Sequence, residues 1–70
     1  MNGLGSKQQR MLLNMRYHGD GGWPPSWKIR FDDRAVLASL AARQLISTPS
    51  EEARLTSAGF LVAASLAGSL

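Results

Sequence analysis

Apolar residues recur at helical spacing near the start of the chain, which predicts a first helix opening at Ser6. Ser6 and Gln9 have the S-x-x-Q spacing of a capping box, in which each side chain satisfies a free backbone N–H at the other's position. Gly19 is expected to end this helix. Residues 1–5 are interpreted as a flexible N-terminus. The predicted buried stripe consists of Met11, Leu12 and Met15.

Glycine and proline then prevent regular structure until residue 26, after which apolar and polar residues alternate. This alternation predicts a short strand over residues 27–31, with Trp27, Ile29 and Phe31 facing the core. Asp32 or Asp33 is expected to cap a second helix that runs to about residue 44. The predicted buried stripe of that helix consists of Val36, Leu37, Leu40 and Ala41.

A hairpin is predicted next, with strands over residues 45–48 and 53–56 around a turn at residues 49–52. Leu55 is expected to be buried beneath this hairpin. Thr56 or Ser57 is expected to cap a last helix that extends to residue 70. One side of that helix is expected to carry Phe60, Leu61 and Ala64 together with Leu66 or Ala67.

Two short patterns in the second half of the chain are specific when they are taken together. Leucines at 37, 40 and 45 precede Ile46, and Leu55, Thr56 and Gly59 form an L-T-x-x-G element. Their order and spacing resemble the recognition helix, wing and terminal helix of MarR-like winged-helix domains. The resemblance implies one α+β, mostly helical, winged-helix-like domain over residues 6–70. Its expected order is helix, short strand, helix, β-hairpin wing and helix.

The sequence departs from this winged-helix pattern at three places. Gln44 stands where a glycine normally ends the second helix. Residues 21–26 contain two glycines and two prolines, so the first helix of a helix-turn-helix has no counterpart. The wing turn at residues 49–52 carries Glu51 and Glu52, where a DNA-binding wing presents lysine or arginine.

The uneven distribution of charge bears on a nucleic-acid partner. Residues 1–30 carry five cations against one aspartate, which is +4, and residues 31–70 carry three cations against four acids, which is −1; the net charge is +3. The resemblance implies a bacterial or phage DNA-binding transcription regulator, with Arg34, Ala35 and Ser39 at base edges. The acids at the second helix and wing would repel phosphate, so the backbone contacts would rest on other cations. The full set of candidate DNA-binding residues is Lys7, Arg10, Arg16, Lys28, Arg30, Arg34, Ser39 and Arg54.

A second hypothesis belongs to another functional class. The acidic wing favours a protein-interaction module of phage type, such as an inhibitor or adaptor that uses a winged-helix-like fold without binding DNA. Trp23 lies in a loop between Gly22 and Pro24 and is the aromatic residue most suited to such a contact. The candidate partner-binding residues are Trp23, Glu51 and Glu52. The sequence leaves both hypotheses open and names neither an operator nor a protein partner.

Several classes of protein are not expected from the composition. The chain has no cysteine and one histidine, so we expect no disulfide, no metal site and no cofactor. His18, Asp20 and Ser26 share a glycine-rich loop but do not form a recognisable catalytic arrangement, so we expect no enzyme. The most apolar stretch, residues 58–70, is too short to cross a bilayer. We therefore expect a cytoplasmic protein without a membrane partner.

The apolar character of the last helix predicts self-association. Between residues 58 and 70 the only polar side chains are those of Ser65 and Ser69. A helix that is apolar on most sides is normally buried on most sides, and 70 residues supply little mass to cover it. The sequence predicts a homodimer with Val62, Leu66 and Leu70 at or near the interface.

Overall fold

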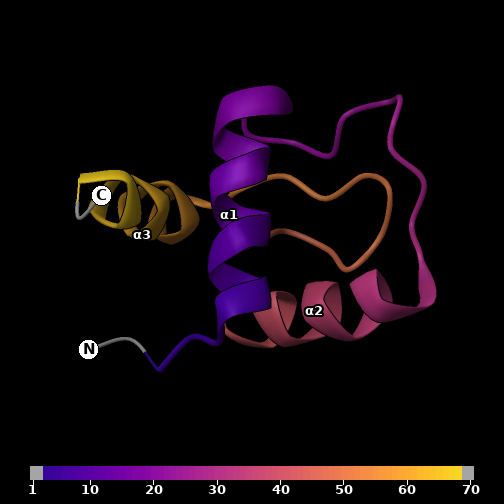
Figure 1. Ribbon diagram of the computed structural model, residues 1–70, viewed down its shortest axis with the longest axis horizontal. Coiled ribbons are helices and arrows are strands. Elements are labelled where there is room, and N and C mark those ends of the chain that lie inside the picture. Colours follow the sequence, from indigo (N-terminus) through magenta and orange to yellow (C-terminus); the bar gives the residue numbers. More distant parts are fainter. Residues whose placement is uncertain (1–2, 69–70) are drawn as a thin grey trace.

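A computed structural model describes residues 3–68 of the chain as three helices joined by long loops (Figure 1). The helices are α1 (Ser6–His18), α2 (Phe31–Ala42) and α3 (Ser57–Gly68). α1 packs against both of the others, whereas α2 and α3 have no backbone contact with each other in the described residues. None of the three helices has the length and apolarity that a membrane span requires.

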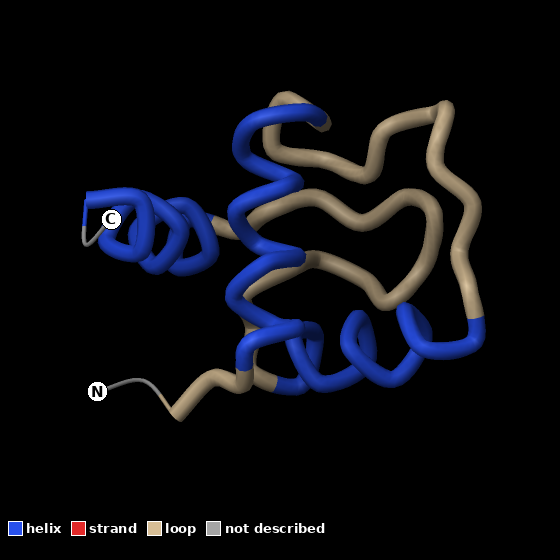
Figure 2. Tube along the Cα trace, viewed as in Figure 1, coloured by secondary structure: helices blue, strands red, loops and turns tan. Residues whose placement is uncertain are grey.

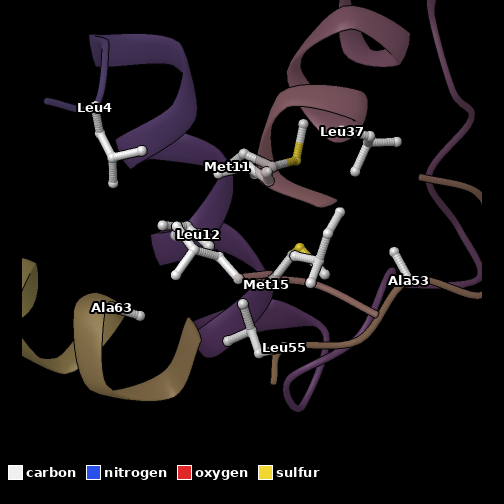
Figure 3. Packing of buried hydrophobic residues seen from close by; sticks show 11 residues of the cluster. Leu4, Met11, Leu12, Met15, Leu37, Ala53, Leu55 and Ala63 are labelled. Atoms are coloured by element: carbon white, nitrogen blue, oxygen red, sulfur yellow. The ribbon is translucent and has the colours of Figure 1, made fainter. Parts of the chain in front are cut away.

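The hydrophobic core lies where α1 meets the loops on either side of it. Met11, Leu12 and Met15 are buried, so the stripe predicted for the first helix is confirmed. α2 contributes Leu37 and Leu40, in agreement with its predicted stripe. Figure 3 shows the side chains of this cluster gathered from all three helices and from the segment that carries Ala53 and Leu55. The remaining members of the core are Leu4, Leu45, Ile46 and Ala63.

The predicted α+β, winged-helix-like fold is wrong, because residues 3–68 contain three helices and no strand or sheet (Figure 2). The hairpin is reduced to one isolated antiparallel bridge between Ile46 and Leu55. A second isolated bridge joins Gly22 to Arg54, and here Leu55 donates its N–H to the Gly21 carbonyl oxygen at 2.5 Å. Leu55 is buried, as the sequence predicts.

Prolines explain why these bridges do not grow into strands. A proline has no backbone N–H, so it cannot extend a ladder of hydrogen bonds. Pro24 and Pro25 follow directly after the hydrogen bond from the Trp23 N–H to the Ala53 carbonyl oxygen. Pro49 follows two residues after Ser47, whose N–H donates to the Arg54 carbonyl oxygen beside the bridge at Ile46. Each pairing therefore stops after about one residue.

The strand predicted over residues 27–31 is also absent, because α2 begins at Phe31, before either of the two expected caps, Asp32 and Asp33. The Asp33 carboxylate accepts a hydrogen bond from the Arg30 backbone N–H at 3.0 Å, so Asp33 caps the helix from within its first turn. This places Phe31 at the first helical position with 89% of its surface exposed, whereas the strand pattern predicted that it faces the core. Trp27 and Ile29 are half-buried against the core.

The structure also corrects the predicted N-terminal cap of α1 and shows which residues of α3 are buried. Gly5 is the N-cap of α1, and its N–H donates to the Gln8 side chain at 2.7 Å, so the predicted Ser6–Gln9 box is wrong by one residue. Gly19 ends α1 as predicted. In α3 the buried positions are Gly59 and Ala63. Phe60, Leu61 and Ala64, which the sequence placed on one side of this helix, are all exposed. Of the residues predicted at a dimer interface, Val62 and Leu66 are half-buried against the core, and Leu70 lies outside the described residues.

The junction from α2 to α3 explains the roles of the L-T-x-x-G element and of Gln44, which stands where the winged-helix pattern has a glycine. Gln44 has a left-handed backbone with φ of 62°, which is the conformation that the expected glycine would supply. The Leu45 N–H bonds to Leu40 and the Gln44 N–H to Ala41, so α2 ends in a complete Schellman motif. Thr56 caps α3, since its hydroxyl accepts from the Gly59 N–H at 3.0 Å.

Candidate nucleic-acid interface

A continuous groove runs along one side of α1, between this helix and residues 23–33. It consists of three adjoining hollows, and all three are lined by Asn14. The central hollow has a volume of about 670 Å³ and is floored by Met11, Trp23 and Trp27. We call this feature the basic groove, for the four cations that line it. These are Lys7, Arg10, Lys28 and Arg30.

One side of α1 forms the first wall of the basic groove, and the spacing of its residues explains why. Lys7, Arg10, Asn14 and His18 are spaced by three, four and four residues, which puts them on one side of α1 over its whole length. Each of the four lines one or more of the hollows. Arg16 is six residues after Arg10 and therefore points about 120° away from it. It lies outside the groove, where its guanidinium is 5.5 Å from the centre of the Tyr17 ring.

The opposite wall is formed by the proline-containing loop, which local hydrogen bonds hold in place. The Trp23 N–H donates to the Ala53 carbonyl oxygen at 2.9 Å, and the Trp27 N–H donates to the Pro24 carbonyl oxygen at 3.0 Å. The two indole rings meet edge to face with centroids 5.1 Å apart, and the His18 ring lies 6.4 Å from that of Trp27. This turn carries the exposed Lys28 and Arg30 to the groove.

The balance of charge in the basic groove is positive. Its four cations are all exposed, whereas the two acids beside them are Asp32 and Asp33. Asp33 is half-buried, and its carboxylate is bound to the Arg30 backbone N–H as the cap of α2. The cap therefore offsets part of the repulsion that the Asp33 carboxylate would otherwise exert on an anion. Four exposed cations against one exposed acid make this surface suitable for phosphate groups.

The other residues predicted to bind DNA lie elsewhere. Arg34 is exposed in a separate hollow that it shares with Ile29 and with the turn at residues 49–52. Ser39 is half-buried and links two helices, because its hydroxyl accepts from the Gln8 side chain at 2.6 Å and donates to the Val36 carbonyl oxygen at 2.7 Å. Arg54 is exposed, and its side chain lies against Gly22.

The predicted partner-binding residues do not form one site. Glu51 and Glu52 are exposed at the turn beside Arg34. Trp23 is half-buried in the floor of the basic groove, and its indole N–H is buried without a hydrogen-bond partner. Arg34 therefore lines a hollow with the acidic turn, whereas Trp23 lines the basic groove together with Lys28 and Arg30.

Sequence reasoning missed Asn14 and assigned Phe31 to the core, although the fold makes both residues prominent at the surface. Asn14 lies at the centre of the basic groove, and its helical spacing from Lys7 and Arg10 is the signal that identifies it. Phe31 is the most exposed of the large apolar side chains in residues 3–68, but no local signal marks it, since its exposure depends on where α2 begins. Comparisons with known protein families, curated proteins and solved structures find no match to this chain.

Proposed function

We propose that this chain is a small DNA-binding regulator that holds the phosphate backbone in the basic groove. The observation that carries this proposal is the convergence of exposed cations from two separate segments. Lys7 and Arg10 come from α1, and Lys28 and Arg30 come from the loop before α2. Phosphate contacts by lysine and arginine supply most of the affinity in non-specific DNA binding.

The groove also offers groups that suit the sugars and bases of a bound strand. The Asn14 amide provides both a donor and an acceptor at the centre of the groove. The half-buried indoles of Trp23 and Trp27 provide an apolar floor between the cations. Base-edge contacts by Arg34 and Ala35 form no part of this proposal, because they were implied only by a winged-helix fold that residues 3–68 do not have.

Binding of labelled random duplex DNA across a salt series, followed by fluorescence anisotropy, tests the proposal. Each lost phosphate contact lowers the slope of log affinity against log salt by about 0.9. Removal of two contacts in Arg10→Gln with Arg30→Gln should lower it by about two units. Arg16→Gln is the matched control, because Arg16 lies on α1 outside the groove. We expect it to lower the slope by less than either groove variant does alone.

Two results would overturn this function. Absence of binding by the unmodified chain at low salt would exclude DNA as the partner. An equal loss of slope in Arg16→Gln and Arg10→Gln would show that net charge, rather than the basic groove, determines binding.

A protein-interaction module is the second candidate, and one specific observation favours it. Phe31 is 89% exposed on α2, three residues before Arg34, which lines a hollow together with Glu51 and Glu52. An exposed aromatic side chain with charges of both signs nearby is typical of a contact for a protein partner. Phe31→Ala would then abolish binding to that partner and leave the slope of DNA binding against salt unchanged.

A further inference from the structure

Aromatic rings distinguish the basic groove from a simple patch of surface cations. Trp23 and Trp27 are the only two tryptophans of the chain, and both line the central hollow. Trp27 also lines the neighbouring hollow beside His18, and the centroids of these two rings are 6.4 Å apart. The aromatic surface therefore continues from one hollow into the next.

Charge and aromatic surface are concentrated at opposite ends of the basic groove. Lys7, Arg10 and Arg30 line the hollow at one end, and Arg30 also lines the central hollow. The hollow at the other end is lined by His18 and Trp27, and neither a lysine nor an arginine contributes to it among the described residues. A ligand that fits this groove carries anionic groups in line with flat rings, which is the composition of a nucleotide chain.

A strand must be unpaired for its bases to reach these rings. In a duplex each base is stacked between its neighbours and paired, so only its edges are accessible from the grooves. The bases of a single strand have free faces, and stacking on an aromatic side chain holds them whatever the sequence. The rings of Trp23 and Trp27 are half-buried at the bottom of a concave surface, which suits an extruded base better than the convex outside of a duplex.

The rings are fixed before a ligand arrives. The backbone N–H groups of Trp23 and Trp27 donate to the carbonyl oxygens of Ala53 and Pro24, and the two indoles pack edge to face at 84°. Stacking on such rings costs little conformational entropy. The central hollow, at about 670 Å³, is within the size range of pockets that hold small molecules, so it has room for a base and its sugar.

We propose that the basic groove binds single-stranded DNA, with a base stacked on Trp27 and the phosphates held by the four cations. This inference rests on the proposed function, which gives DNA as the partner, and adds that the preferred form is an unpaired strand. An acidic peptide would also satisfy the cations, but acidic side chains have no ring to place on the aromatic floor.

Intrinsic fluorescence of the full chain tests the inference, because both tryptophans line the groove. Oligothymidylate of about 15 nucleotides should quench the fluorescence at low salt. We expect it to bind about tenfold more tightly than a thymidylate–adenylate duplex of the same length. The duplex should still bind through the cations, but without quenching.

Trp27→Ala should lower the affinity for oligothymidylate about tenfold and leave the affinity for the duplex unchanged. Trp27→Phe keeps a ring and should retain most of the affinity, which separates stacking from a change in the fold. Tyr17→Ala is the matched control, because Tyr17 is an aromatic residue of α1 that is 64% exposed and lies outside the groove. It should bind both ligands like the unmodified chain, and circular dichroism should show native helicity in all three variants.

Equal affinities for the single strand and the duplex, or equal losses in Trp27→Ala and Tyr17→Ala, would overturn this inference and leave the proposed DNA binding intact. Absence of binding to either form of DNA would overturn the proposed function as well. Polyglutamate that binds as tightly as oligothymidylate would show that charge alone determines binding. Tighter binding of oligouridylate would assign the groove to RNA instead of DNA.

Discussion

Gly59 of α3 lies against the backbone carbonyl of Leu45, so closely that a β-carbon at position 59 would overlap the carbonyl oxygen. The carbon atom of the same carbonyl would be 3.0 Å from that β-carbon. This contact seats the first turn of α3 on the end of the segment that follows α2. It explains why the L-T-x-x-G element has a glycine within a helix, where glycine is otherwise unfavourable.

Gly59→Ala should destabilise the protein strongly. The obstacle is backbone rather than a flexible side chain, so α3 must shift away from Leu45 and lose contact with the core. We expect a loss of about 2–3 kcal/mol in the free energy of unfolding, measured by urea denaturation. Gly68→Ala is the control, because no atom lies within 4 Å of an added β-carbon there. A neutral or stabilising Gly59→Ala would contradict the described seat of α3.

Thr56→Val should cost about 1–2 kcal/mol although the side chain keeps its shape. The Thr56 hydroxyl donates to the Gln44 carbonyl oxygen at 2.6 Å and accepts from the Gly59 N–H at 3.0 Å, so valine removes both bonds. Thr56→Ser keeps the hydroxyl and should recover most of the loss. Urea denaturation separates the two variants, and equal losses in both would mean that the hydroxyl is not the stabilising group.

Gln44→Gly should stabilise the protein by about 0.5–1 kcal/mol, because glycine adopts the left-handed conformation without strain. Gln44 has φ of 62° at the end of α2. At the neighbouring Arg43, φ is −87°, so Arg43→Gly should instead destabilise through the added freedom of the unfolded chain. Thermal unfolding would compare the two. A lower melting temperature for Gln44→Gly would show that the Gln44 side chain contributes more than its backbone costs.

Glu51→Lys should leave the free energy of unfolding unchanged within about 0.5 kcal/mol, because Glu51 is exposed at a turn. If the chain binds DNA, its affinity for DNA should rise at low salt, since an exposed acid is replaced by a cation in the hollow that Ile29 and Arg34 line. Anisotropy and urea denaturation measure the two effects. An unchanged affinity for DNA would place the turn away from the bound backbone, and loss of binding to a protein partner would favour the protein-interaction module.

Local signals were sufficient for the helices but not for the segments between them. The periodic stripe of Met11, Leu12 and Met15, and the glycine that ends α1, depend on neighbours within one or two turns. The alternation over residues 27–31 predicted a strand, but a strand needs a partner with free N–H and C=O groups. Residues 27–31 have no such partner among the described residues, and the Asp33 cap starts a helix at Phe31 instead.

The sequence by itself determined the three helices, most of their buried residues and the concentration of positive charge in the first thirty residues, because each depends on local spacing or on composition. Only the tertiary structure decided which cations share a surface. Lys7 and Arg10 meet Arg30 across about twenty residues of chain, whereas Arg16 is turned away from them by the pitch of α1. It also decided which side of α3 is exposed, since that helix is apolar on most sides and its sequence periodicity favours none of them.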